Sequence, residues 1–167
     1  MTGCSKRIGP GYVGIKVNLS GDNRGVADIP VTTGRVYYNL FTQEVLVYPT
    51  FMQAAVWTGN INEGRALNEE ITFTTSDQLQ VAADISLAYQ IDAEKVPAFY
   101  VKFRNDDIDK FTHGFLRNMA REKFDNAAGK YKIENIMGDN AKFLKEARDS
   151  LQASVKDVGV KITQFGF

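Results

Sequence analysis

The sequence predicts an α+β fold in which strands come first, helices follow and one strand closes the chain. Apolar residues recur with a period of two from Tyr12 to Ile91, which is typical of strands. From Asp92 onward the period becomes 3.6, as in amphipathic helices, and it returns to two after Gly159. Strands and helices that are segregated along the chain favour a mostly antiparallel sheet over parallel βαβ units.

The composition is that of an ordinary globular protein. The 167 residues are 44% hydrophobic and 24% charged, and 20 basic residues balance 20 acidic ones. This balance gives no field that would attract nucleic acid, so we expect no nucleic-acid partner. A single cysteine (Cys4) and a single histidine (His113) exclude an intramolecular disulfide and leave little for a metal site. No apolar run approaches the roughly 20 residues that span a bilayer.

The N-terminal part is expected to be a β-rich lobe over residues 11–68, preceded by a flexible segment over residues 1–10. The flexible segment is predicted because Ser5–Gly11 is polar and rich in Gly and Pro. Tyr12–Leu19 alternates and predicts the first strand, which ends in a turn over Ser20–Gly25. Further short strands are predicted at Val31–Thr33, Arg35–Tyr38, Gln43–Tyr48 and Gln53–Thr58.

Two further features of this lobe lead to predictions of their own. A hairpin turn at Asn39–Thr42 is expected to pair the strands on either side of it. Six aromatic residues gather between Tyr37 and Trp57, and they indicate either core packing or an aromatic binding groove. Gly59–Glu70 is polar and is expected to be a loop between the two lobes.

The second lobe, over residues 69–167, is expected to begin with a hairpin. Ile71–Thr75 and Val81–Ile91 both alternate, and Ser76-Asp77-Gln78 between them is turn-like. We therefore predict one short strand followed by one long strand. Asp84 is expected to be a solvated residue on the wetter face of the long strand.

Two or three helices are predicted after this hairpin. The first covers Asp92–Phe103, and the second starts after a cap at Asn105-Asp106-Asp107. A short turn is expected at Ile133–Met137, followed by a helix capped by Gly138-Asp139-Asn140. The buried stripe of the second helix is predicted as Ile108, Phe111, Phe115, Met119 and, at its end, Lys123–Phe124. That of the last helix is predicted as Leu144, Ala147, Leu151, Val155 and Val158. Gly159 is expected to end the last helix, and Val160, Ile162 and Phe165 to form the closing strand.

Residues that could support catalysis are few. Asp109, His113 and Arg117 are spaced four apart on one predicted helix, with Arg121 next in line. A histidine beside a carboxylate can act as a general base or as half of a metal site. The same spacing is also that of an exposed ladder of i,i+4 ion pairs. No phosphate-binding loop, nucleophile elbow or nucleotide fingerprint is found, so we expect no catalytic, cofactor or metal site.

Cys4 is the one candidate modification site. Thr2-Gly3-Cys4-Ser5 resembles the end of a bacterial lipoprotein signal, in which the cysteine becomes the lipidated first residue of the mature protein. That pattern normally has Leu three residues before the cysteine, where this sequence has Met1. The alternative is an initiator methionine followed by a frayed polar tail.

The order of several motifs resembles that of the stomatin/prohibitin/flotillin superfamily, also called SPFH or band 7. The motifs are Pro10-Gly11-Tyr12-Val13-Gly14-Ile15, Thr74-Thr75-Ser76-Asp77-Gln78-Leu79-Gln80-Val81, Asp84-Ile85-Ser86-Leu87-Ala88-Tyr89-Gln90-Ile91-Asp92, Phe115-Leu116-Arg117-Asn118-Met119-Ala120-Arg121 and Gly159-Val160-Lys161-Ile162. The block from Gly25 to Met52 is similar to prohibitin-like bacterial and phage proteins in particular. The resemblance covers nearly the whole chain and implies one SPFH-like domain over residues 11–167.

The resemblance implies a non-catalytic scaffold at a membrane surface. Such domains assemble side by side into homo-oligomers, organise membrane microdomains and modulate partners such as membrane proteases. An anchor at the N-terminus agrees with a lipid on Cys4, which would place the protein in a bacterial cell envelope; without the lipid we expect a soluble protein. Family members usually continue into a coiled coil that drives assembly, and no heptad repeat is found here, so ring formation is expected from the resemblance alone.

Two other functions compete with this one. The first is a soluble module that binds a lipid or a peptide through the aromatic lobe from Tyr37 to Trp57. The second is an enzyme that uses Asp109 and His113.

Overall fold

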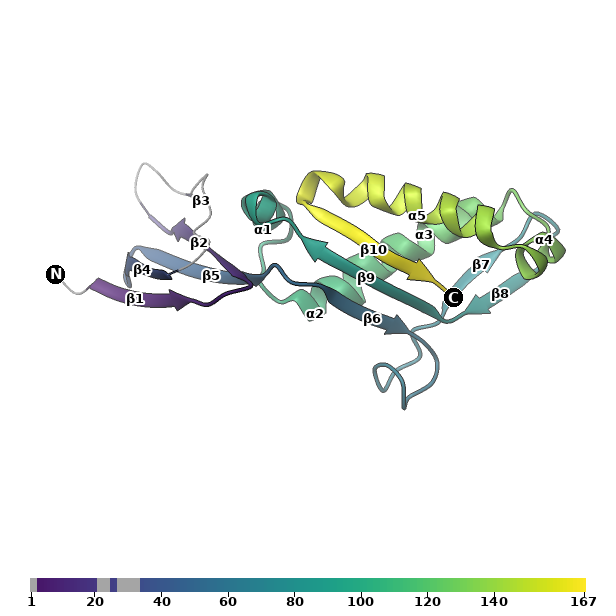
Figure 1. Cartoon of the computed structure of the whole chain (residues 1–167), viewed down its shortest axis with the longest axis horizontal. Coiled ribbons are helices and arrows are strands. Elements are labelled where there is room, and N and C mark those ends of the chain that lie inside the picture. The colour runs from purple at the N-terminus through teal and green to yellow at the C-terminus, as the bar shows by residue number, and fades with distance from the viewer. Residues whose placement is uncertain (1–2, 21–24, 27–33) are drawn as a thin grey trace. The chain divides into compact units, whose positions relative to one another are not determined.

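The computed structural model describes residues 3–20, 25–26 and 34–167, and it confirms the α+β class (Figure 1). The chain divides into two compact units. The first unit comprises residues 1–52, 90–108 and 156–161, and the second comprises residues 53–89, 109–155 and 162–167. The units interleave along the chain, whereas the sequence pattern predicts consecutive lobes over residues 11–68 and 69–167.

The first unit contains two small antiparallel sheets. Strand β1 (Gly3–Ile8) pairs with β4 (Gly34–Asn39). Strand β2 (Tyr12–Asn18) pairs with β5 (Gln43–Pro49) and with β3 (Gly25–Val26). The strands predicted at Tyr12–Leu19, Arg35–Tyr38 and Gln43–Tyr48 are confirmed, whereas the one predicted at Val31–Thr33 lies outside the described residues.

Strand β1 lies in the part of the chain for which a flexible segment over residues 1–10 is predicted, and its Gly3–Ile8 stretch is paired in a sheet. Ile8, at its end, is 2% exposed and packs in one cluster with Val36 and Val45. It also lies against Gly14 of β2, where an added Cβ would stand 2.7 Å from Cδ1 of Ile8. Only one residue of β1 is buried, so its sequence lacks the apolar alternation that indicates a strand.

The prediction that the strands on either side of Asn39–Thr42, β4 and β5, pair as a hairpin is wrong. A tight turn does join them, with the Thr42 N–H donating to the Asn39 carbonyl at 3.2 Å. Among the described strands, however, β4 pairs with β1 and β5 pairs with β2. Sequence spacing cannot reveal this, because a turn between two strands does not require that they share a ladder.

A short helix completes the core of the first unit. The 3-10 turn η1 (Ala93–Lys95) leads into α1 (Val96–Phe103), with Pro97 in its first turn as predicted. Phe99 of α1 is 1% exposed and makes an edge contact with Tyr48 of β5, with ring centroids 5.7 Å apart. Gly159 has φ +81°, and an added Cβ would lie 2.2 Å from the Cβ of Lys95, so this position requires glycine.

The second unit contains the main sheet and a separate hairpin. The sheet has the strand order β10 (Val160–Gly166), β9 (Ile85–Ile91), β6 (Gln53–Trp57). The hairpin pairs β7 (Ile71–Thr74) with β8 (Gln80–Ala83). The long strand predicted over residues 81–91 is therefore wrong as a single element, because it breaks at Asp84 and its two halves join different sheets (Figure 1).

The second predicted helix contains a π-helical segment that changes which residues are buried. It runs through α2 (Ile108–Lys110), the π-helix η2 (Phe111–Leu116) and α3 (Arg117–Ala128). A π segment adds a residue to the turn, so the buried stripe moves by one position. Phe111 and Phe124 are buried as predicted, but between them the stripe runs through Leu116 and Ala120 in place of Phe115 and Met119.

The remaining helices are close to the prediction. The short helix α4 spans Ile133–Gly138, and α5 spans Ala141–Val155 before the 3-10 turn η3 (Lys156–Val158). In α5 the buried stripe begins at Phe143 and not at Leu144. Rings from four elements meet in the second unit: Phe73 (β7), Phe124 (α3), Phe143 (α5) and Phe165 (β10), in pairs with centroids 5.1–5.8 Å apart. None of the helices in the described part of the chain has the length and apolar character needed to cross a membrane.

Candidate functional site

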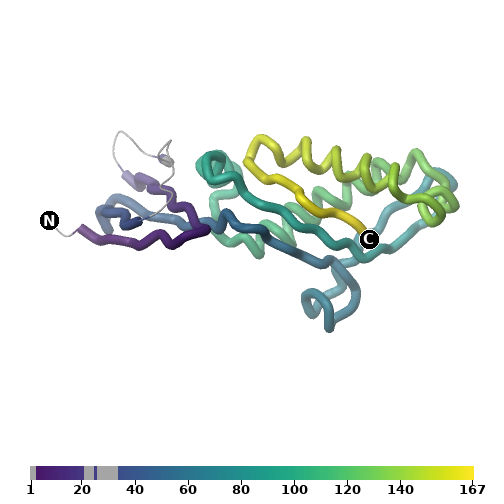
Figure 2. Tube along the Cα trace, viewed as in Figure 1, coloured from purple at the N-terminus to yellow at the C-terminus, as the bar shows by residue number. Residues whose placement is uncertain are grey.

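Cys4 is held in an ordered strand. In the register of β1 with β4, Cys4 lies opposite Tyr38 and Gly3 lies opposite Asn39. The turn that follows Asn39 therefore lies at the same end of the first unit as the start of β1 (Figures 1 and 2). The thiol is free and partly exposed. Lipid attachment at Cys4 stays a prediction.

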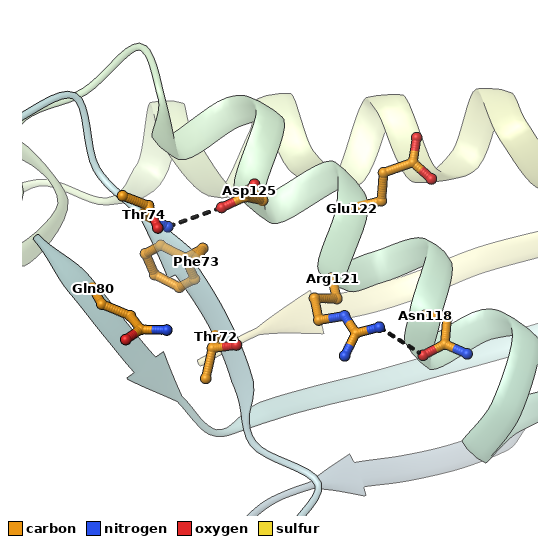
Figure 3. Close-up of a pocket in the computed structure, with 8 residues that line it drawn as sticks. All are labelled: Thr72, Phe73, Thr74, Gln80, Asn118, Arg121, Glu122 and Asp125. Atoms are coloured by element: carbon orange, nitrogen blue, oxygen red, sulfur yellow. Dashed lines mark hydrogen bonds between the residues drawn. The ribbon is translucent and has the colours of Figure 1, made fainter. Parts of the chain in front are cut away.

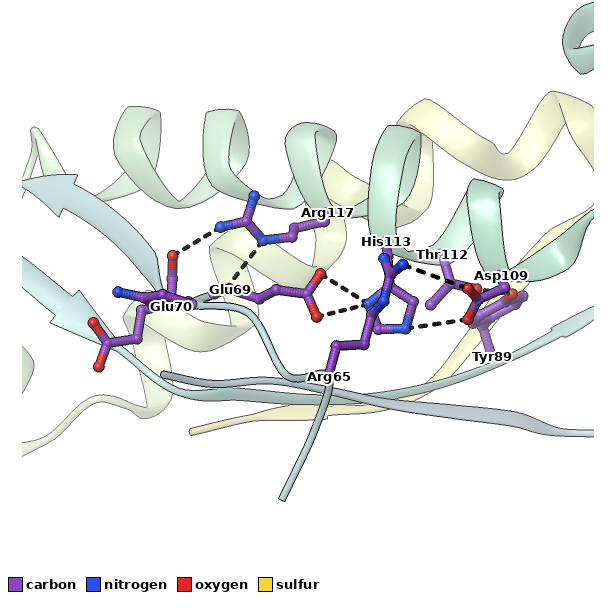
Figure 4. A network of polar contacts seen from close by, with 9 residues as sticks. Arg65, Glu69, Glu70, Tyr89, Asp109, Thr112, His113 and Arg117 are labelled. Carbon is purple, nitrogen blue, oxygen red and sulfur yellow. Dashed lines mark hydrogen bonds and ion pairs between the residues drawn. The ribbon is translucent and has the colours of Figure 1, made fainter. Parts of the chain in front are cut away.

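The most extensive polar cluster of the second unit surrounds His113 (Figure 4). Nδ1 of His113 lies 2.9 Å from both carboxylate oxygens of Glu69, and Nε2 lies 3.6 Å from Oδ1 of Asp109. The side chains of His113 and Glu69 are only 11% and 8% exposed, whereas that of Asp109 is 69% exposed. The contact with Glu69 is thus a desolvated one, in which a hydrogen bond is stronger than in water.

Arg117 fixes the backbone beside this contact. Its Nε donates to the carbonyl of Glu69 and its Nη2 to the carbonyl of Glu70, both at 3.1 Å. His113 and Arg117 are one helical turn apart, so they reach the same stretch of chain just before β7. We call Glu69, His113 and Arg117 the Glu69 latch, because together they hold the end of the loop over residues 59–70 against the helix.

The contacts of the latch test the i,i+4 ladder predicted from the Asp109–His113–Arg117–Arg121 spacing. The Asp109–His113 contact is made as an i,i+4 pair, and Arg65 reaches Asp109 at 3.9 Å. Arg117, however, donates to loop carbonyls, and Arg121 donates to Oδ1 of Asn118 at 3.2 Å. The prediction of an exposed ladder of i,i+4 ion pairs is therefore wrong beyond the Asp109–His113 pair.

Tyr89 and Thr112 form a buried pair near the latch. The hydroxyl of Tyr89 on β9 lies 2.5 Å from Oγ1 of Thr112, and both residues are buried. Burial raises the pKa of Tyr89 to about 12, despite the opposing effect of the Thr112 hydrogen bond. Tyr89 therefore stays neutral at physiological pH and acts as a hydrogen-bonding group that links β9 to η2.

A polar cleft lies between β7 and α3 (Figure 3). It has a volume of about 690 Å³ and is lined by Thr72, Phe73, Thr74, Gln80, Asn118, Arg121, Glu122 and Asp125. The Thr74 N–H donates to Oδ1 of Asp125 at 2.9 Å, which ties the edge of β7 to the helix. The lining carries both signs of charge, so it favours neither an anion nor a cation.

The other sequence candidates have structural roles. Asp84 is exposed and accepts from the Gly59 N–H at 3.4 Å. At the predicted cap, Oδ1 of Asn105 accepts from the Asp107 N–H at 2.8 Å, and α2 begins at the next residue. The aromatic residues of the first lobe do not behave alike: Tyr48 and Trp57 are fully buried, whereas Tyr37 and Phe41 are 68% and 77% exposed.

Glu69 is the residue of this cluster that the sequence pattern does not reveal. It lies in a polar stretch that predicts a solvated loop, yet the residue as a whole is only 6% exposed. Its partner His113 is 44 residues away, so no local spacing connects them. The one signal in the sequence is a helical face that carries His113, Arg117 and Arg121 but a single carboxylate, Asp109, so a second acidic partner would have to come from elsewhere.

No group of three or more His, Cys, Asp or Glu side chains in the described ranges is placed to hold a metal ion. A family model described as SPFH domain / Band 7 family matches residues 6–167. No curated protein matches the chain. The family match spans both units and every motif on which the resemblance was based. The chain belongs to the SPFH domain / Band 7 family.

Proposed function

We propose that this protein is a non-catalytic scaffold module that is attached to a membrane surface by a lipid on Cys4, assembles with copies of itself and organises membrane proteins. Membrane-associated scaffolds are the general context of SPFH domains, and the family is generally non-catalytic. Membrane proteases are one class of partner that such a module would organise. The bacterial cell envelope is the location that this attachment requires.

The position of Cys4 within β1 is the observation that carries the proposal. A lipid on a frayed tail would tether the domain loosely. Here Cys4 is paired with Tyr38, so a lipid on it would join the bilayer directly to a strand of the first unit. The described helices include no membrane-spanning candidate, and a lipid on Cys4 would supply the attachment.

The Glu69 latch supports a structural role for the residues that most resemble a catalytic group. The carboxylate of Glu69 binds His113, and the guanidinium of Arg117 binds two backbone carbonyls. A general base needs an imidazole nitrogen that can reach a substrate proton. In the latch one nitrogen contacts Glu69 and the other faces Asp109.

Mass spectrometry tests the attachment. The protein is expressed from its full reading frame in a bacterium that processes lipoproteins, and the membrane fraction is digested and analysed. We expect Cys4 to carry acyl chains, and a Cys4→Ser variant to leave the membrane fraction. Full-length protein with an unmodified Cys4 in the soluble fraction would contradict the proposal.

Cross-linking tests the assembly. Membranes that contain the protein are treated with a lysine-reactive cross-linker, since the chain is rich in exposed lysines such as Lys142 and Lys161. We expect a ladder at multiples of the 18.6 kDa chain mass. A single monomer band from membranes that do hold the protein would rule out assembly while leaving the lipid attachment intact.

A further inference from the structure

The turn between β4 and β5 carries Leu40 and Phe41, of which Phe41 is the most exposed large apolar side chain in the described part of the molecule. Leu40 is 57% exposed and Phe41 is 77% exposed. Leu19, whose N–H donates to the Thr42 carbonyl at 2.8 Å, lies beside the turn and is 48% exposed. We call Leu19, Leu40 and Phe41 the apolar tip. Exposed apolar groups gathered at one point are uncommon unless they meet a partner.

Several backbone groups of the turn are hydrogen-bonded within it. The Asn39 side chain accepts from the Phe41 N–H at 3.0 Å, and the Gln43 side chain accepts from the Asn39 N–H at 3.0 Å. Gln43 also donates to Oδ1 of Asn18 at 2.9 Å. Each polar group that is already paired lowers the free-energy cost of moving the turn out of water.

The described residues nearest the tip carry no charge: Cys4, Asn18, Leu19, Ser20, Asn39, Leu40, Phe41, Thr42 and Gln43. The first charged residue along β5 is the exposed Glu44, opposite Val17. Charged groups are the ones that oppose transfer into the membrane interface, and aromatic side chains are favoured there. The chemistry of the tip and of its nearest described neighbours therefore fits a lipid surface.

The register of β1 with β4 shows how far the apolar tip extends beyond Cys4. Cys4 lies opposite Tyr38, so Leu40 and Phe41 extend about two residues, or about 7 Å, beyond the level of Cys4. Interfacial apolar groups sit about 5–10 Å into the boundary between headgroups and acyl chains. A lipid on Cys4 would thus place the tip at the depth where its side chains leave water.

We propose that the apolar tip inserts into the lipid interface and forms a second membrane contact beside Cys4. The inference rests on the proposed membrane function, in which a lipid on Cys4 is the first contact. A protein partner fits this surface poorly, because three side chains on a convex turn cannot bury the 1,000 Å² or so that a specific interface needs. Two contacts at one end of the first unit would fix the orientation of that unit, which a single lipid chain cannot do.

Tryptophan quenching in vesicles tests the insertion. The sole cysteine, Cys4, is coupled to a maleimide-headgroup lipid in phosphatidylethanolamine/phosphatidylglycerol vesicles whose acyl chains carry bromine, which quenches tryptophan inside the bilayer. The probe variant is Phe41→Trp, and the matched control is Met137→Trp, whose position in the second unit is 75% exposed. Trp57, fully buried, gives the same background in both.

We expect the bromine-dependent quenching of Phe41→Trp to be several times that of Met137→Trp and of the unsubstituted protein. Equal quenching in the two variants would overturn the proposal. So would a change of oligomer mass in lipid-free solution on Phe41→Ser without quenching in Phe41→Trp, because the tip would then be a contact between copies. Chemical coupling bypasses cellular lipidation, so a failure of Cys4 acylation and a failure of tip insertion give separate results.

Discussion

Glu69→Gln tests whether the Glu69 latch stabilises the second unit. The substitution keeps the shape of the side chain and removes its charge. Both carboxylate oxygens lie 2.9 Å from Nδ1 of His113, and the two side chains are 8% and 11% exposed, so water screens the contact little. Hydrogen bonds to charged groups contribute about 1.5–3 kcal/mol. We expect Glu69→Gln to lower the free energy of unfolding by about 2 kcal/mol.

Asp109→Asn is the matched control, because it removes a carboxylate from the other nitrogen of the same imidazole. Asp109 is 69% exposed and lies 3.6 Å from Nε2, so its loss should cost less than about 0.5 kcal/mol. Urea unfolding followed by the fluorescence of Trp57 measures both variants. Trp57 is fully buried and belongs to the second unit, as the latch does.

A double-mutant cycle with His113→Gln isolates the pair from other effects of each substitution. We expect the coupling energy between positions 69 and 113 to account for most of the loss in Glu69→Gln. If Glu69→Gln costs no more than Asp109→Asn, or if the two substitutions at positions 69 and 113 are additive, burial does not strengthen this contact and the reasoning fails.

Three further predictions concern single residues. Gly159→Ala should lower the free energy of unfolding by about 2–4 kcal/mol, because φ is +81° and the new Cβ would meet the side chain of Lys95 in η1. The control Gly129→Ala, at φ −58°, should leave the free energy of unfolding unchanged or raise it. Equal losses of stability for the two variants in urea unfolding would contradict this prediction. The hydrogen bond from Lys130 lowers the pKa of Glu146, so this contact stabilises the folded state above the ordinary glutamate pKa, and the stabilisation is lost as the pH falls through the lowered pKa. Glu146→Gln should therefore reduce the loss of folding free energy with falling pH in the acid range. An unchanged acid dependence would argue against this. Burial raises the pKa of Tyr89 from 10.0 to about 12, so its contribution is complete below pH 10.0 and declines as the pH rises through about 12. Burial raises the pKa of Tyr48 still further. In an absorbance titration Tyr89→Phe should therefore remove signal from a step near pH 12, and loss of signal from a step near pH 10.0 would refute the assignment.

The local sequence pattern was sufficient to predict an element wherever one residue type or one period of apolar residues dominates. The alternation of Tyr12–Leu19 predicted β2, and Gly159 predicted the end of the last helix at a backbone angle that only glycine adopts easily. The α+β class followed from the order of periods along the chain, and the motifs from Pro10 to Ile162 predicted the SPFH family, which the family match confirms.

Contacts between distant segments decided the rest. β1 exists because Ile8 packs against Val36 and Val45, and no local pattern marks it. The strand predicted over residues 81–91 breaks at Asp84 because its halves find different partners, β7 and β6. The π segment moves the buried stripe by one residue, an insertion that apolar spacing alone cannot distinguish from a regular helix.

The candidate sites divide in the same way. The sequence by itself determined the family, and it singled out Cys4 and the spacing of Asp109, His113 and Arg117. The tertiary structure decided what surrounds them: Tyr38 opposite Cys4, an exposed Phe41 at the same end, and Glu69 against His113. The physical reason is that periodicity reports the burial of neighbours within one element, whereas pairing and hydrogen-bond partners depend on which segments fold together.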